Sequence, residues 1–292
     1  MIGGAAFFGA GTAVLWGVSD VVARLSGRSV GVLVTTLSLM VVGSIALVAY
    51  AFGSGAVIDW NPDGYWLIAL SGVGMAVGTL LIFSALTRGP VSLASPTVAS
   101  YPAIAVLLSV ALGARPDLIH WLAMIATMAG VWLVAYSVGN KRNRHLPDYE
   151  RANVRRTLIL SSVSAVIFAV AILAADFAID RYGWLQTLLG SRLSGIVIIG
   201  GVMLARREAI GAIPPRTWPL LLIVGTLDTF GHALLYIGLA LPNGEFAVVA
   251  SAAYTGVTTI IARLFLREPV APIQWLGIAA IIGGIAALNW FG

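Results

Sequence analysis

Long apolar stretches, separated by short polar connectors, run along almost the entire chain. They lie at about residues 5–25, 30–53, 64–87, 91–113, 118–138, 156–178, 183–205, 217–240, 245–266 and 272–291. Each stretch is close to the ~20 residues that an α-helix needs to cross the hydrocarbon core of a bilayer. The pattern therefore predicts an all-α membrane protein with ten transmembrane helices.

The composition agrees with this prediction. Hydrophobic residues make up 59% of the chain, charged residues 10%, and the mean hydropathy is +0.97. Water-soluble domains contain about 25% charged residues, so a soluble fold is excluded. The net charge of +5 comes from basic residues between the apolar stretches, without an aromatic-interleaved basic patch. We therefore expect the lipid bilayer, and not nucleic acid, as a partner.

The chain also lacks the residues of most catalytic and metal sites. It contains no cysteine and only three histidines, which are not at metal-ligand spacing. HExxH, GxSxG and P-loop motifs are absent. We therefore expect no enzyme activity, no metal, no cofactor and no ATP-driven transport by this chain alone.

A polar segment, GNKRNRHLPDYERANVRR at 139–156, divides the apolar stretches into two sets of five. It predicts a first five-helix repeat at 1–138, a cytoplasmic linker at 139–155 and a second repeat at 156–292. A shift of about 153 residues aligns ARPDLIHWLAMIATMAG at 114–130 with REPVAPIQWLGIAAIIGG at 267–284, and Tyr101 with Tyr254. Because five is odd, the second copy would cross the membrane in the opposite sense, giving two inverted repeats around a central cavity.

The basic residues predict the orientation. Short connectors make neighbouring helices antiparallel, so alternate connectors share one face of the membrane. One face would carry only Arg115 and Arg181. The other, expected to be cytoplasmic, would carry Arg24, Arg28, Arg88, Lys141, Arg142, Arg144, Arg151, Arg155, Arg156, Arg206, Arg207, Arg216, Arg263 and Arg267. With an even number of helices, both termini are then predicted to be external.

Three segments resemble a known family. They are LWGVSDVVARLSG at 15–27, SALTRGPVSLASPTVASYPAIAVLLS at 84–109 and RLFLREPVAPIQWLGIAAIIGG at 263–284. With them, essentially the whole chain resembles the drug/metabolite transporter superfamily, in its ten-helix form with two EamA-type halves. Within it, the chain looks most similar to the bacterial aromatic amino-acid exporter. The resemblance implies a bacterial inner-membrane location and a small-molecule substrate.

Two charged residues lie deep inside predicted spans. A charge there costs about 2.5–3.5 kcal/mol on insertion scales, so Arg192 and Asp228 need partners. At 1.5 Å per residue, Arg192 lies roughly 13 Å from the external end of its helix and Asp228 roughly 16 Å from the cytoplasmic end of the next. We therefore predict an Arg192–Asp228 pair at mid-membrane. It is either a structural lock or part of a substrate or proton-coupling site.

Other candidate residues lie near this pair or at equivalent positions in the two halves of the chain. His232 lies one helical turn beyond Asp228 on the same face, where it could bind substrate, relay a proton or hydrogen-bond a neighbouring helix. Tyr101 and Tyr254 occupy equivalent positions in the two halves and either bind a planar or cationic solute or pack in the core. The other predicted substrate-binding residues are Trp16, Ser19, Thr79 and Phe168.

Two further features concern helix geometry and a surface pair. Pro96 and Pro102 interrupt the span at 91–113, and proline in a span permits a bend that either gates the cavity or forms a static kink. Asp20 and Arg24 have the i,i+4 spacing of an ion pair near the cytoplasmic edge of the membrane. This spacing indicates a structural role for the two residues.

These features predict a secondary transporter. It would export amino acids, aromatic or other neutral ones, or similar small metabolites across the inner membrane by alternating access. Three alternatives remain: an uncoupled facilitator or channel, a drug or sugar-derivative transporter of the same superfamily, and a structural membrane subunit. The sequence is compatible with a monomer.

Overall fold

The fold is described from a computed structural model of the chain, covering residues 4–58, 62–89, 91–113, 115, 117–142, 148–208, 211–265 and 272–291. These residues form helices and contain no strand. The helices are α1 (Ala5–Val30), α2 (Val32–Ser54), α3 (Tyr65–Arg88), α4 (Val91–Val98), α5 (Tyr101–Ala111), α6 (Leu118–Arg142), α7 (Asp148–Ala205), the 3-10 turn η1 (Pro215–Thr217), α8 (Trp218–Leu239), α9 (Glu245–Ser251), α10 (Tyr254–Phe265) and α11 (Pro272–Phe291).

The distribution of apolar side chains is that of a membrane protein. Seven segments of the described residues are long and apolar enough to cross a bilayer, and α6 and α11 contain shorter apolar stretches. Large apolar side chains face outward, whereas serines, threonines and several charged groups are buried. An exposed apolar surface of this extent is unfavourable in water and matches lipid. The expectation of an all-helical, multi-pass membrane protein is confirmed at this level.

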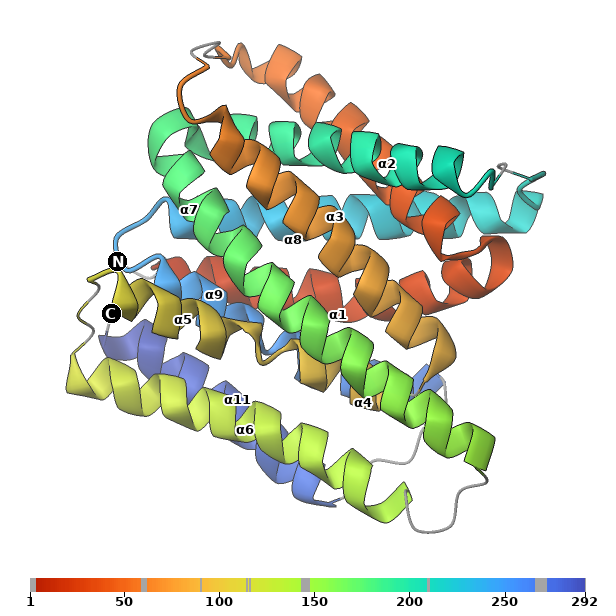
Figure 1. The fold of residues 1–292 in the computed structure, drawn as a ribbon. Coiled ribbons are helices and arrows are strands. Elements are labelled where there is room, and N and C mark those ends of the chain that lie inside the picture. Colours follow the sequence, from red (N-terminus) through yellow and green to blue (C-terminus); the bar gives the residue numbers. More distant parts are fainter. Residues whose placement is uncertain are drawn as a thin grey trace.

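Helix α7 consists of two arms that reverse direction at Gly183. This residue has φ 74° and ψ 164°, a conformation that only glycine adopts readily. In Figure 1 the two arms meet at this reversal, at one end of the bundle, and diverge from it. They correspond to the spans expected at 156–178 and 183–205, but the first arm begins at Asp148, so helix extends into the expected linker.

Two of the expected spans are broken. The stretch expected at 91–113 is divided into α4 and α5, with Pro96 inside α4 and Pro102 in the first turn of α5. The stretch expected at 245–266 is divided into α9 and α10 around Ala252 and Ala253, where no proline occurs. The prediction of one continuous helix at 245–266 is therefore wrong.

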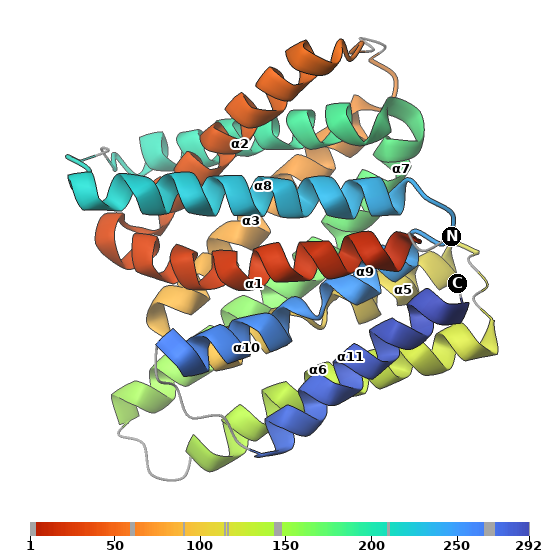
Figure 2. The same cartoon turned by 180° about the vertical axis from the view of Figure 1, so that it is seen from behind.

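The helices pack so that the two broken spans lie in the middle. Helix α1 packs against α8, α9 and α10, helix α3 packs against α7, and α6 packs against α11. Figures 1 and 2 show the start of α1 and the end of α11 at the same end of the bundle. Pro116, Glu268 and Pro269, from the junctions that suggested the repeat, and residues 143–147 of the expected linker lie outside the described residues.

The interface between α3 and α7 depends on close backbone approach at Gly72. A Cβ atom there would lie 2.6 Å from the Ser191 carbonyl oxygen and 2.8 Å from its Cα atom, whereas a Cβ at Gly200, also on α7, would meet nothing within 4 Å. Backbone atoms cannot move aside easily, and overpacking costs about 1–3 kcal/mol. We expect Gly72→Val to lower the melting temperature of the purified protein clearly. Gly200→Val is the matched control, and equal melting of the two variants would contradict this packing.

Candidate functional site

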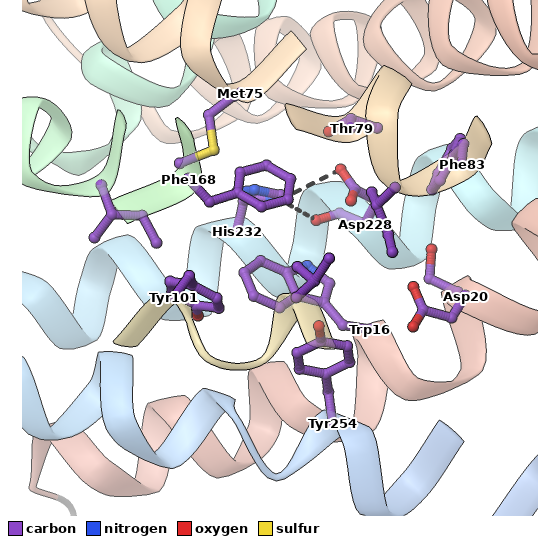
Figure 3. A pocket seen from close by; sticks show the side chains of 14 residues that line it. Trp16, Asp20, Met75, Thr79, Phe83, Tyr101, Phe168, Asp228, His232 and Tyr254 are labelled. Atoms are coloured by element: carbon purple, nitrogen blue, oxygen red, sulfur yellow. Dashed lines mark hydrogen bonds and ion pairs between the residues drawn. The ribbon is translucent and has the colours of Figure 1, made fainter. Parts of the chain in front are cut away.

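A cavity at the centre of the bundle is the candidate site. All seven residues predicted to bind substrate line it, together with Asp228. They come from α1, α3, α5, the first arm of α7, α8 and α10, so helices from both halves of the chain form the wall (Figure 3). The full lining is Trp16, Ser19, Asp20, Met75, Thr79, Ile82, Phe83, Val98, Tyr101, Phe168, Ile172, Asp228, His232 and Tyr254.

The ion pair expected between Arg192 and Asp228 is present. Arg192 Nη2 lies 2.5 Å from Asp228 Oδ2. His232 joins the pair, because its Nδ1 lies 3.1 Å from Arg192 Nη2 and 2.9 Å from the Asp228 carbonyl oxygen. The tautomer of His232 decides whether Nδ1 accepts from Arg192 or donates to the backbone. The three side chains form one cluster between the second arm of α7 and α8.

The members of this cluster differ in their access to the cavity. Asp228 and His232 line it, whereas Arg192, only 2% exposed, stands behind them. Arg192 Nη1 also donates to Met40 Sδ at 3.4 Å, and its Nε has no hydrogen-bond partner among the described residues. A guanidinium whose donors are so sparsely satisfied depends strongly on the Asp228 carboxylate.

Two aromatic pairs with similar geometry form part of the cavity wall, and each is called a corner of the cavity. The rings of Trp16 and Tyr254 meet edge to face at 6.1 Å, and those of Phe168 and Tyr101 at 6.2 Å. Trp16 also lies 4.7 Å from the His232 ring. These separations are typical of favourable aromatic pairs, and ring faces attract planar or cationic groups.

Most of the lining residues fall into pairs whose members are separated by nearly the same number of positions. Ten of the fourteen lie 152 or 153 residues from another lining residue. The pairs are Trp16 with Phe168, Asp20 with Ile172, Met75 with Asp228, Thr79 with His232, and Tyr101 with Tyr254. The two halves of the chain therefore contribute matching positions to one wall.

Comparison with known families agrees with this division. The model of the EamA-like transporter family matches residues 3–136 and, separately, residues 155–290. The chain belongs to the EamA-like transporter family. The family expected from the three sequence segments is thus confirmed, and this EamA-like protein is a member of a family of membrane transporters.

One solved structure, described only as "Crystal structure of protein", is similar to this EamA-like protein. The two share 18% sequence identity and a TM-score of 0.75, over 98% of this chain and 96% of the other. At this identity the likeness concerns the fold alone. Among curated proteins, no match is found.

The two tyrosines tie the broken spans of the EamA-like protein to each other. Tyr101 begins α5 and its hydroxyl lies 2.5 Å from Ser251 Oγ at the end of α9. Tyr254 begins α10 and its hydroxyl donates to the Ser95 carbonyl oxygen in α4 at 2.9 Å. Each break is therefore held by a hydrogen bond from the other broken span.

The position of Asp20 corrects the sequence interpretation. Among the described residues, its carboxylate accepts hydrogen bonds from Ser95 Oγ and, at 3.3 Å, from Thr258 Oγ1, and the expected ion pair with Arg24 is not formed. Asp20 instead faces the cavity, one turn along α1 from Trp16 (Figure 3). The four-residue spacing from Trp16 was the signal that could have placed it there.

We expect each charge of the buried ion pair to need the other for the stability of the protein. Asp228→Asn would leave Arg192 buried without a compensating charge, which costs about 3–5 kcal/mol. The double variant Arg192→Met/Asp228→Leu removes both charges and should recover most of the lost melting temperature. Thermal unfolding of the purified protein measures both effects.

The control is the exposed pair between Arg181 and Asp63, whose charged atoms lie 3.8 Å apart with side chains 45% and 79% exposed. Asp63→Asn should change stability by less than about 1 kcal/mol. The assigned role of the buried pair is wrong if Asp228→Asn unfolds at the same temperature as Asp63→Asn.

Proposed function

We propose that this protein is a secondary transporter that exports small solutes, aromatic or other neutral amino acids in the first place, by alternating access. The observation that carries the proposal is a cavity whose wall is built from five matched pairs of residues, one member from each half. Substrate sites of secondary transporters lie at the interface between structural repeats. Transporters of this kind need no nucleotide-binding domain, since an ion or solute gradient drives them.

The packing supports ten crossings arranged as two inverted repeats. Thr12 in α1 donates to the Gly231 carbonyl oxygen in α8 at 3.0 Å, and Ser164 in α7 donates to the Gly78 carbonyl oxygen in α3 at 2.9 Å. Gly78 and Gly231 are 153 residues apart, and Thr12 and Ser164 are 152 apart. The same contact is thus made twice with the halves exchanged, as a two-fold relation between repeats would require.

The broken spans supply a route for conformational change. A continuous helix resists bending, whereas the breaks at 99–100 and 252–253 place hinges beside the cavity. Pro96 and Pro102 restrict the first hinge and remove backbone donors from it. We assign these prolines a gating role, with the Tyr101 and Tyr254 hydroxyl contacts as the bonds that exchange when one half rocks against the other.

The wall suits an aromatic amino acid. The Trp16–Tyr254 and Phe168–Tyr101 corners offer ring faces and edges to a planar side chain. Asp228 and His232 provide an acceptor and a titratable imidazole near Thr79 for the polar end. The inner membrane of a bacterium, with both termini external, fits the basic residues of the connectors.

The ion pair itself favours a second candidate, an uncoupled facilitator. Asp228 is already neutralised by Arg192, so this pair can remain intact without taking up a proton. Efflux that is insensitive to an imposed pH gradient, and retained in Arg192→Met/Asp228→Leu, would support facilitation and a purely structural pair. Acceleration by an inward proton gradient would support coupled export.

The test of the proposed function is tryptophan efflux from proteoliposomes. We expect Phe168→Ala to slow efflux about 3- to 10-fold, because one aromatic contact is worth about 0.5–1.5 kcal/mol. Phe177→Ala is the matched control, since Phe177 lies on the same arm of α7 and faces outward, 47% exposed. An absence of tryptophan efflux from wild-type vesicles, or equal rates for the two variants, would contradict an aromatic substrate in this cavity.

A further inference from the structure

The cavity contains one carboxylate for which no ion-pair partner is found among the described residues. Asp228 is paired with Arg192, whereas Asp20, 8% exposed, receives hydrogen bonds from the neutral hydroxyls of Ser95 and Thr258 and from no other side chain in the described part of the protein. Asp20 lines the same cavity as Asp228 (Figure 3). The cavity and the cluster behind it contain two carboxylates, Asp20 and Asp228, and one arginine. A cation from outside the protein can therefore bind there with favourable electrostatics.

Among the described residues, no element packed around Asp20 forms an ion pair with its carboxylate. Helix α4 contains no ionisable residue, and α10 presents Tyr254 beside Thr258. Helix α8 presents Asp228 and His232, with Arg192 behind them. Helix α3 presents only uncharged groups to the cavity, namely Met75, Thr79, Ile82 and Phe83. On α1 itself, Arg24 lies one turn away and forms no ion pair with Asp20 among the described residues.

The fold does not require an acid at this position. In the other half the matching position is Ile172, which also lines the cavity and is 3% exposed. A buried apolar side chain therefore satisfies the same packing environment on the opposite side. Because a carboxylate in the membrane interior is costly, its presence at one of two matching positions points to a ligand.

We propose that Asp20 is a cation-binding residue that holds a proton in the empty cavity and the ammonium group of the substrate in the loaded one. This inference rests on the proposed transport function and adds a substrate requirement: an aromatic ring and a protonated amine. On loading, the carboxylic O–H bond of Asp20 breaks, its proton passes to water, and the carboxylate forms an ion pair with the ammonium. No oxidant or other reactant is required.

The neighbours of Asp20 connect the exchange of proton and ammonium to the breaks in the two broken spans. Ser95 belongs to α4 and Thr258 to α10, so the carboxylate joins both broken spans to α1. Thr258 Oγ1 also lies 3.3 Å from the Gly17 carbonyl oxygen, an alternative acceptor on α1. An ammonium group bound to Asp20 competes with these hydroxyls for the same oxygens. Loading therefore changes the contacts of both broken spans at once.

The test compares two probes of nearly the same shape, 2-phenylethylamine and 2-phenylethanol, in binding titrations with the purified protein. We expect the wild type to bind the amine about 10-fold more tightly than the alcohol, since hydrogen bonds to charged groups are the stronger ones. A pH indicator in weakly buffered solution should report release of up to one proton for each amine bound, and none for the alcohol.

Asp20→Asn should abolish both the preference for the amine and the proton release, while Asp20→Glu should retain them in part. Asp180→Asn is the matched control, because Asp180 is an exposed carboxylate on α7 outside the cavity. Size-exclusion profiles establish that each variant is folded, and Asp20→Ile, with the residue of the matching position, replaces Asp20→Asn if the latter aggregates.

Two results would overturn the inference: a wild type that does not prefer the amine or releases no proton, and an Asp20→Asn protein that keeps both properties. Failure of the proposed function is a separate outcome, observed as absence of tryptophan efflux from wild-type proteoliposomes. If the wild type transports tryptophan and Asp20→Asn binds the amine as the wild type does, the proposed transport function is supported and the proposed role of Asp20 is excluded.

Discussion

The structure depends on one constraint: inside a bilayer, every charge and every backbone polar group has to find its partner within the protein. Arg192 and Asp228 meet this constraint by pairing, and the backbone at the breaks of the two broken spans meets it through local hydrogen bonds, such as that from Ala252 N–H to the Val249 carbonyl oxygen. Polar groups are therefore concentrated at the centre of the bundle. The cavity lies in this region, and Asp20, Asp228 and His232 are part of its wall.

The overall fold could be predicted from the sequence because the same constraint acts along the chain. Hydropathy gave the membrane helices, and the depth of Arg192 and Asp228 in consecutive antiparallel helices was enough to predict their contact. The residues predicted to bind substrate, such as Trp16 and Phe168, line one cavity. Trp16 and Phe168 lie 152 positions apart, so the spacing that suggested the repeat recurs in the cavity wall.

Other features could not be predicted, for physical reasons. The break between α9 and α10 occurs at Ala252 and Ala253, residues with no local preference for ending a helix, so it is imposed by the packing of the whole bundle. The role of Asp20 was missed because an i,i+4 spacing to Arg24 indicates a pair on an isolated helix. Its actual partners, Ser95 and Thr258, are distant in sequence and become neighbours only after folding.

The symmetry of the cavity wall makes its asymmetric charge informative. Met75 and Ile172 occupy the positions that match Asp228 and Asp20, so each carboxylate has an apolar counterpart in the other half. The ion pair of Asp228 lies entirely within the second half, between α7 and α8, so the proposed rocking of the halves would leave it intact. Asp20, by contrast, belongs to the first half and accepts a hydrogen bond from Thr258 of the second. In the proposed transport cycle, a charge that stays paired can shape the cavity but does not respond when the cavity opens to one side or the other. The carboxylate whose bonds cross between the halves is the one that can link the occupancy of the cavity to its opening.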